Sequence, residues 1–246
     1  MLEKIDLKLK LTKEEYSARM PDLQQHLHLL QRRCRKAELA SIIVFEGWSA
    51  CGKGKVINRL TERLEPRGFS LHNIVAPRTH EKRMPWLGRF WSKIPKWGEM
   101  AIFDGSWYRR VLLEELENKL TDAEYQTAFN DIRSFENALA DDRYLLVKFF
   151  LHINKKTQKK RLKKLESDPL TEWRVQEKDW RQHRRYDRYL LVIEDMLRLT
   201  DAGSAPWVIV EAKNQRWARV KVLESLCDHL ERGLQKFEPK DNNGSK

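Results

Sequence analysis

The sequence predicts an α/β fold in which helices cover both faces of a parallel sheet. Short β-branched and aromatic runs alternate along the chain with segments of helical periodicity, and this alternation is typical of parallel sheets. A glycine-rich segment directly follows the first of these apolar runs, where loops that bind phosphate occur. With 246 residues, of which 41% are hydrophobic, the chain can bury one large core.

The elements can be placed in order from periodicity and capping signals. Thr12 and Glu15 form a capping-box pattern, and apolar residues follow at helical spacing as far as Leu30, so a long amphipathic helix comes first. Five apolar runs predict buried strands at residues 41–46, 71–76, 100–104, 145–151 and 207–211. Helical periodicity predicts helices at residues 56–64, 109–119, 122–140 and 220–234. The polar tail at residues 240–246 is expected to be disordered.

Charge and cysteine content restrict the partners and the compartment. The chain has 48 Lys and Arg residues against 36 Asp and Glu, and this net charge of +12 predicts a polyanionic partner. Nucleic acid, an anionic membrane surface, a nucleotide and a phosphate polymer all satisfy that criterion. No apolar run approaches the roughly 18 to 20 residues of a membrane span, and no secretory signal is evident, so we expect a soluble cytoplasmic protein. Cys34, Cys51 and Cys227 have neither disulfide-framework nor zinc-site spacing.

The strongest local signal is the segment GWSACGKGK at residues 47–55. It matches the pattern G-x-x-x-x-G-K, in which glycines let backbone N–H groups surround a phosphate while the helix N-terminus and the lysine supply positive charge. Gly54 stands where the pattern usually has Ser or Thr, so the hydroxyl that would bind Mg²⁺ is absent. The residues predicted to bind phosphate or nucleotide here are Gly47, Ser49, Ala50, Cys51, Gly52, Lys53, Gly54 and Lys55.

Asp104 ends the third predicted strand, in the segment MAIFDGSWYRR. Ligands gather at the carboxyl edge of a parallel sheet, so this aspartate is the expected Mg²⁺ ligand beside the glycine-rich loop. The alternative is that Asp104 only caps the following helix. Cys51 also has two interpretations: a reactive thiol whose pKa is lowered by Lys53 and the helix N-terminus, or a small residue that fills space.

A basic segment lies between the fourth and fifth predicted strands. Residues 155–164 read KKTQKKRLKK, with seven basic side chains and no acid. Arginines and aromatic residues continue this character through residues 173–188. Such a run is either a solvated helix face or a cationic track for a polyanion.

Taken together, these motifs resemble the polyphosphate kinase 2 family over about residues 9–230. The opening KLTKEEYSARMPDLQ is similar to the branch associated with AMP phosphorylation. The motifs that carry the resemblance are G-W-x-A-x-G-K-G in the loop, P-R-G at residues 66–68, F-D-x-S-W-Y at 103–108, F-E at 135–136, Q-x-K-R at 158–161, D-P-L at 168–170 and A-P-W at 205–207.

The resemblance implies transfer of a terminal phosphate between inorganic polyphosphate and a nucleotide, from AMP to ADP or from ADP to ATP, with Mg²⁺. It implies a P-loop kinase-like three-layer sandwich in one domain over residues 1–239, a helical lid over about residues 155–188, and assembly as a homodimer or homotetramer. Its expected catalytic residues are Lys53, Asp104, Arg110 and Arg161, with Asp104 on Mg²⁺, and Lys160 would bind phosphate or nucleotide. Arg109 stands where the family has an asparagine, and we expect it to bind phosphate or nucleotide as well.

Two positions depart from the family pattern. Ser49 replaces the aspartate of the loop, and Gly105 replaces an arginine, for which Arg109 is a partial substitute. Losing a metal-binding carboxylate or a transition-state arginine commonly costs a factor of about a hundred to a hundred thousand in rate. The first alternative is therefore a degenerate member that binds polyphosphate or nucleotide without efficient turnover. A basic nucleic-acid-binding protein is a third hypothesis, supported only by charge and interleaved aromatic residues.

Overall fold

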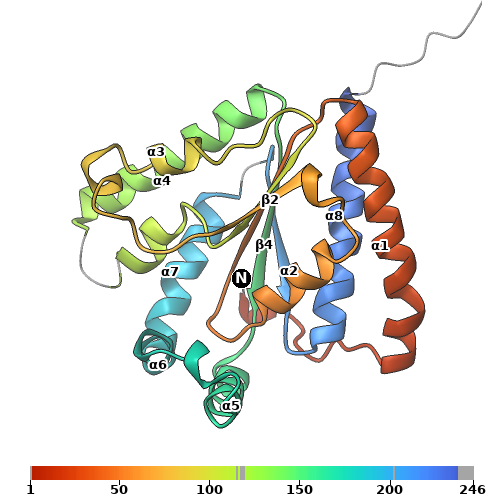
Figure 1. Cartoon of the computed structure of the whole chain (residues 1–246). Coiled ribbons are helices and arrows are strands. Elements are labelled where there is room, and N and C mark those ends of the chain that lie inside the picture. The colour runs from red at the N-terminus through yellow and green to blue at the C-terminus, as the bar shows by residue number, and fades with distance from the viewer. Residues whose placement is uncertain (1, 115, 117–119, 202, 238–246) are drawn as a thin grey trace, which may run out of the picture.

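Five parallel strands form the central sheet of the computed structural model, which describes residues 2–114, 116, 120–201 and 203–237 (Figure 1). Their order across the sheet is β2-β3-β1-β4-β5. The strands are β1 (Ser41–Gly47), β2 (Phe69–Asn73), β3 (Met100–Asp104), β4 (Leu145–His152) and β5 (Trp207–Glu211). The predicted α/β fold with a parallel five-stranded sheet is confirmed.

β1 lies at the centre of the sheet, between β3 and β4. Ile43 of β1 pairs with Ile102 on one side and with Val147 on the other. All three side chains are fully buried, because a parallel sheet covered on both faces leaves its central strands no contact with water. The loop that follows β1 therefore leaves from the middle of the carboxyl edge.

β2 is displaced from its predicted position at residues 71–76. A 3-10 turn, η2 (Pro66–Gly68), ends directly before Phe69, and pairing with β3 begins there, with Phe69 opposite Met100. The pairing ends with Asn73 opposite Asp104, where β3 itself ends. Strand partners thus set these bounds, and the apolar residues 74–76 continue beyond the sheet.

Helices cover both faces of the sheet (Figure 1). α1 (Lys13–Lys36), α2 (Lys53–Thr61) and α8 (Gln215–Phe237) lie on one face, and α3 (Gly88–Trp91), α4 (Asp122–Asp141) and α7 (Tyr186–Leu199) lie on the other. α1 begins with the predicted capping box: the Thr12 hydroxyl accepts from the N–H of Glu15, whose carboxylate accepts from the N–H of Thr12. Short 3-10 turns also occur at η1 (Leu2–Lys4), η3 (Glu81–Arg83) and η5 (Glu172–Arg174).

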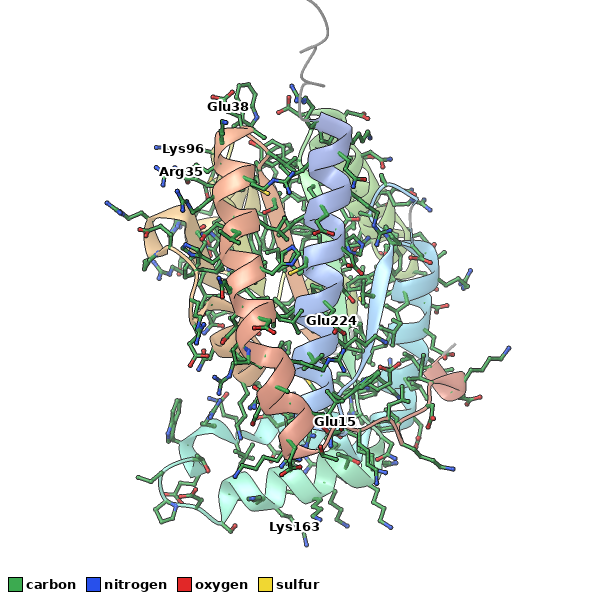
Figure 2. All side chains as sticks on the ribbon, turned by 90° about the vertical axis from the view of Figure 1, so that its right-hand side faces the viewer. Glu15, Arg35, Glu38, Lys96, Lys163 and Glu224 are labelled. Carbon is green, nitrogen blue, oxygen red and sulfur yellow. The ribbon has the colours of Figure 1, made fainter. Side chains whose placement is uncertain are left out.

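Two basic helices lie between β4 and α7: α5 (Lys155–Glu166) and α6 (Glu177–Arg184). We call residues 155–185 the lid segment. It lies at the carboxyl edge of the sheet, beyond the ends of the covering helices (Figure 1). Figure 2 shows α5 crossing near the first turns of α1, with Lys163 directed away from the body of the molecule. That the segment moves as a lid stays a prediction.

The segment after β3 differs from its prediction. Instead of an α-helix over residues 109–119, a π-helical turn, η4, covers Arg110–Glu114, while residues 115 and 117–119 lie outside the described chain. π turns occur frequently at functional sites. The predicted disordered tail at residues 240–246 also lies outside the described residues. Among the helices that the structure describes, none has the length and apolar character needed to cross a bilayer.

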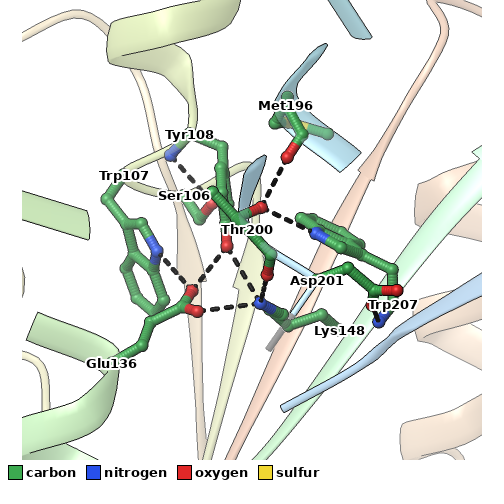
Figure 3. A network of polar contacts seen from close by, with 9 residues as sticks. All are labelled: Ser106, Trp107, Tyr108, Glu136, Lys148, Met196, Thr200, Asp201 and Trp207. Atoms are coloured by element: carbon green, nitrogen blue, oxygen red, sulfur yellow. Dashed lines mark hydrogen bonds and ion pairs between the residues drawn. The ribbon is translucent and has the colours of Figure 1, made fainter. Parts of the chain in front are cut away.

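A buried polar network fixes the start of this segment (Figure 3). The Glu136 carboxylate of α4 accepts hydrogen bonds from the Trp107 indole at 2.9 Å and the Tyr108 hydroxyl at 2.7 Å. Lys148 of β4, which is fully buried, donates to Glu136 at 2.8 Å and to the Thr200 carbonyl at 2.8 Å. Burial lowers the pKa of Lys148, and the Glu136 carboxylate opposes this effect. The turn after β3 is therefore anchored to three other elements.

Candidate active site

The glycine-rich loop at residues 48–52 connects β1 to α2 at the carboxyl edge of the sheet, where parallel α/β sheets bind ligands. Gly47 and Gly52 have φ angles of 148° and 104°. A Cβ at Gly47 would lie 2.6 Å from the carbonyl oxygen of Leu151, and a Cβ at Gly52 would lie 2.5 Å from Oε1 of Gln215. The positive φ favours glycine at both positions, and at Gly47 the backbone of Leu151 also leaves no room for a Cβ, whereas at Gly52 the near atoms belong to the side chain of Gln215.

Lys53 is the first residue of α2, and the leading N–H groups of a helix have no partner within it, which makes them donors to an anion. The Lys53 Nζ lies 3.9 Å from Oδ1 of Asp104, the last residue of the neighbouring strand β3. Burial opposes the charge on Lys53, but the carboxylates of Asp104 and Glu46 help to hold its pKa above the ordinary value. The structure therefore brings together a charged lysine and the predicted Mg²⁺ ligand.

Glu46 is a buried carboxylate that the sequence analysis did not single out. It accepts hydrogen bonds at 2.8 Å from both the backbone N–H and the hydroxyl of Ser106. Burial raises the pKa of Glu46. These contacts tie the end of β1 to the turn that follows Asp104. In the sequence, Glu46 could have been found as an acidic residue at the end of an otherwise apolar predicted strand, residues 41–46.

Asp104 has surroundings that fit a magnesium ligand. Its side chain is 31% exposed beside the loop. Mg²⁺ is usually bound through one or two carboxylates, with waters and substrate phosphates completing its octahedron. In the described part of the chain, no cluster of three or more His, Cys, Asp or Glu side chains forms a closed metal cage. Asp104 therefore fits as one ligand of a Mg²⁺ ion whose other ligands would be waters and oxygens of a substrate phosphate.

Arg109 lies beside the space that a side chain at position 105 would enter. Gly105 has a φ of 73°, and a Cβ built on it would lie 3.8 Å from Cδ of Arg109. The positive charge of Arg109 also lowers the pKa of Glu46, although burial dominates that group. The stem of Arg109 therefore packs over Gly105, and its guanidinium acts on the same carboxylate as Lys53.

Arg110 is placed differently from the loop residues. Its guanidinium lies 5.7 Å from the centre of the Trp86 ring, and the Trp86 indole donates to Asp131 of α4 at 3.0 Å. Hydrogen bonds from Thr121 lower the pKa of Glu124, near the start of α4, and the charge of Arg110 adds a smaller contribution. These contacts put Arg110 toward α4. Its predicted catalytic role stays a prediction.

α6 contacts the glycine-rich loop at Ser49. The Ser49 hydroxyl donates to Asp179 at 2.7 Å, and the Ser49 N–H donates to Oε1 of Gln182 at 2.7 Å. Gln158 of α5 donates to the same Gln182 oxygen at 2.9 Å. The lid segment thus lies against the loop through Gln158 of the Q-x-K-R motif and through Asp179 and Gln182, which no motif had indicated. The Asp179 carboxylate lies beside the loop position where the family pattern has an aspartate.

Arg161 and Lys160 are neighbours on α5 with different surroundings. Arg161 donates to the carbonyl oxygens of Ala50 and Cys51 in the loop, at 3.1 and 2.7 Å. It also donates to those of Ala212 and Lys213, after β5, at 2.7 and 3.0 Å. Lys160 is exposed to solvent. Of these two predicted cations, Arg161 binds backbone carbonyl oxygens, whereas no hydrogen bond of Lys160 to a carbonyl is seen among the described residues outside its own helix.

The Cys51 thiol is buried, with 1% of the residue exposed. Burial raises the pKa of this thiol and outweighs the opposite effect of Lys53. The interpretation of Cys51 as a thiol activated by a lowered pKa is therefore wrong, because desolvation was left out of it. Cys51 belongs to the hydrophobic core, which also includes Trp48 and Val56.

The family model described as polyphosphate kinase 2 (PPK2) matches residues 10–238. The chain belongs to the polyphosphate kinase 2 family. Among curated relatives, a polyphosphate:AMP phosphotransferase of Pseudomonas aeruginosa is 38% identical over 236 residues, which are 96% of this chain and 48% of the relative. An ADP-polyphosphate phosphotransferase 3 of Rhizobium meliloti is 33% identical over 92% of this chain and 80% of its own length.

Solved structures of the polyphosphate kinase 2 family have the same fold. That of Pseudomonas aeruginosa PA01 superposes with a TM-score of 0.92 at 38% identity, over 96% of this chain and 50% of the other. The enzyme of Arthrobacter aurescens TC1 superposes with a TM-score of 0.91 at 26% identity, over 100% of this chain and 89% of the other. The chain spans about half the length of the first curated relatives it matches.

Proposed function

We propose that this chain transfers a terminal phosphate between inorganic polyphosphate and a nucleoside mono- or diphosphate. The observation that carries the proposal is the charged Lys53, at the start of α2, 3.9 Å from Asp104 in a chain of the polyphosphate kinase 2 family. Relatives whose names pair polyphosphate with AMP, ADP or NDP support the class of reaction. The choice between AMP and ADP, and the direction of transfer, are part of the proposal to be tested.

The chemistry requires positioning and positive charge more than covalent participation. Backbone N–H groups at the start of α2 would bind phosphate oxygens, and Lys53 would neutralise charge on the migrating group. Arg109 would add a second cation from the turn after β3, on the side where Gly105 leaves space. Mg²⁺ held by Asp104 would supply further neutralisation of phosphate charge when it is bound.

A long polyanion needs a cationic surface that leads to the loop. The exposed lysines of α5 provide one, since this helix follows β4 and Arg161 joins it to the loop backbone. Binding along such a surface weakens steeply with salt, because each contact releases counterions. The exposed basic side chains of α5 are Lys156, Lys159, Lys160, Lys163 and Lys164.

Binding without efficient turnover is the second candidate function. It is favoured by the Ser49 contacts to Asp179 and Gln182, which occupy a loop position that carries a carboxylate in the family pattern. Nucleic-acid binding has less support, because it rests only on charge and on four aromatic residues that could stack bases. Of these, Phe90 is buried and Trp86 donates to Asp131, whereas Trp91 and Trp97 are 50% and 63% exposed.

The deciding experiment is a Mg²⁺-dependent assay with polyphosphate and either AMP or ADP, comparing wild type, Lys53→Ala and a Ser49→Asp/Gly105→Arg double variant. We expect wild-type turnover that falls at least about a hundredfold in Lys53→Ala, the usual effect of removing one group that stabilises transition-state charge. If the wild type shows no turnover while the double variant is active, the proposed kinase activity is contradicted and the binding-only function is supported.

Assembly and location belong to the same proposal. We expect a homodimer or homotetramer, which light scattering at several protein concentrations would measure, and a cytoplasmic location where nucleotides and polyphosphate are available. A monomer at all concentrations would contradict the first expectation without affecting the proposed chemistry.

A further inference from the structure

Arg161 connects two loops through the backbone. Its Nη1 donates to the carbonyl oxygens of Ala50 and Cys51, and its Nη2 donates to those of Ala212 and Lys213. The first pair belongs to the glycine-rich loop, and the second follows β5. Arg161 of α5 therefore ties the glycine-rich loop to the segment that follows β5.

The donors of this guanidinium are almost fully used. An arginine has five N–H donors, of which four are on the two Nη atoms. Four carbonyl oxygens at 2.7 to 3.1 Å match those four donors. Only Nε–H remains, so Arg161 cannot form a bidentate pair of hydrogen bonds with a phosphate while these contacts persist.

These contacts determine where loop N–H groups point. In a trans peptide the C=O and the following N–H point in opposite directions. Holding the Cys51 carbonyl toward Arg161 therefore turns the Gly52 N–H away from Arg161. Gln215 supports the same orientation, since its amide donates to the Cys51 carbonyl at 2.9 Å. In the preceding peptide, the Cys51 N–H donates to the carbonyl of Trp48 at 3.0 Å.

We propose that Arg161 is a positioning residue of the glycine-rich loop: it fixes the loop carbonyls, and so aims the N–H groups, without contacting phosphate. The direct phosphate contacts of α5 then come from exposed lysines such as Lys160. The orientation of the loop stands on the structure alone. Only the consequence for phosphate affinity rests on the proposed function.

The cysteines report on the loop without any ligand. Cys51, Cys34 and Cys227 are all buried, so each is protected from a neutral alkylating reagent in the folded chain. We expect Arg161→Lys and Arg161→Gln to raise the alkylation rate of Cys51 by roughly tenfold or more, because bonds to a charged group are lost. Peptide mass spectrometry would resolve the three sites, and Cys34 and Cys227 should keep wild-type rates. Lys160→Gln is the matched control and should leave all three unchanged.

Binding of tripolyphosphate at several salt concentrations separates positioning from contact. Each lost ionic contact with phosphate should make the slope of log affinity against log salt shallower. We expect this shallower slope in Lys160→Gln. Arg161→Lys keeps the charge but lacks the fork, so it should weaken binding about tenfold at an unchanged slope.

The proposal fails if Arg161→Lys binds tripolyphosphate as tightly as wild type while Cys51 stays protected. It also fails if Arg161→Gln reduces the salt slope as Lys160→Gln does. Alkylation of all three cysteines in Arg161→Gln would mean that this variant has unfolded, and the decision then rests on Arg161→Lys. If wild type binds no tripolyphosphate, the proposed function fails, whereas Cys51 protection still decides the role of Arg161.

Discussion

Ser49 is where the glycine-rich loop and the lid segment meet. Its hydroxyl donates to Asp179 and its N–H to Gln182, so one residue holds α6 through two bonds. A serine can donate to a carboxylate, whereas an ionised aspartate at this position can only accept. The serine that replaces the family carboxylate therefore also permits a hydrogen bond to Asp179 of α6.

Ser49→Asp should release α6 from the loop. Two carboxylates about 4 Å apart repel by about 4 kcal/mol at an effective dielectric constant of 20. We expect amide hydrogen exchange in residues 177–184 to accelerate at least tenfold relative to wild type. Ser49→Ala, which loses the hydrogen bond without adding charge, should show a smaller acceleration. Equal exchange in the two variants would mean that repulsion with Asp179 does not occur.

Gly105 stands at the position of a family arginine, and its backbone conformation bears on whether an arginine fits there. Its φ of 73° lies in the left-handed region, where a residue with a Cβ costs roughly 1 to 2 kcal/mol. No atom lies closer than 3.7 Å to a Cβ built there, so space itself does not exclude an arginine. A restored arginine would meet Arg109, whose stem already crosses this space. For this reason the activity of the double variant is best compared at equal folded fraction.

At the scale of elements, His152 joins β4 to the glycine-rich loop. Its Nδ1 accepts a hydrogen bond at 3.1 Å from the indole of Trp48, and that indole stacks on Tyr186 of α7 with ring centres 4.0 Å apart. Only neutral histidine can accept this bond. Burial lowers the pKa of His152 to about 4.

Stability should therefore fall as the solution is acidified. The unfolded chain binds a proton at His152 below about pH 6.5, whereas the folded chain does so only below about 4, so the contribution is full above 6.5 and is lost toward 4. Between pH 7 and 5, wild type should lose about 2 kcal/mol more unfolding free energy than His152→Asn, whose amide oxygen accepts without titrating. Urea unfolding at the two pH values measures the difference. Equal losses would show that His152 is not the titrating group.

At the scale of the whole molecule, the Glu136–Lys148 pair ties the helices on one face of the sheet to the sheet itself. It links α4, β4, the turn after β3 and the end of α7, and its members are at most 3% exposed (Figure 3). The pair is weak evidence of net stability, since burying two charges is costly. Breaking it is a different matter, because one charge would remain buried without its partner.

Lys148→Met should lower the free energy of unfolding by about 3 to 5 kcal/mol, since it leaves the Glu136 carboxylate without a cation. The double variant Lys148→Met/Glu136→Met removes both charges and should lose less than the sum of the single variants. Urea unfolding of the four proteins forms the thermodynamic cycle. Additive losses would mean that the two charges do not stabilise each other.

Periodicity and local motifs were sufficient for much of this architecture. The capping box of α1, the strand at residues 100–104 and the loop after β1 all depend on residues close together in the chain. The second strand was misplaced because its ends are set by pairing with β3. The π turn was missed because its spacing resembles that of an α-helix over so short a segment.

The sequence by itself determined the parallel sheet, the glycine-rich loop and the placement of Lys53 and Asp104 at one edge, because the carboxyl ends of parallel strands lie at the same edge of a sheet. Only the tertiary structure decided that Asp179 reaches Ser49 and that Arg161 reaches the loop carbonyls. Those partners lie 130 and 111 residues apart. Side-chain hydrogen bonds act over about 3 Å, so no periodicity or spacing along the chain encodes them.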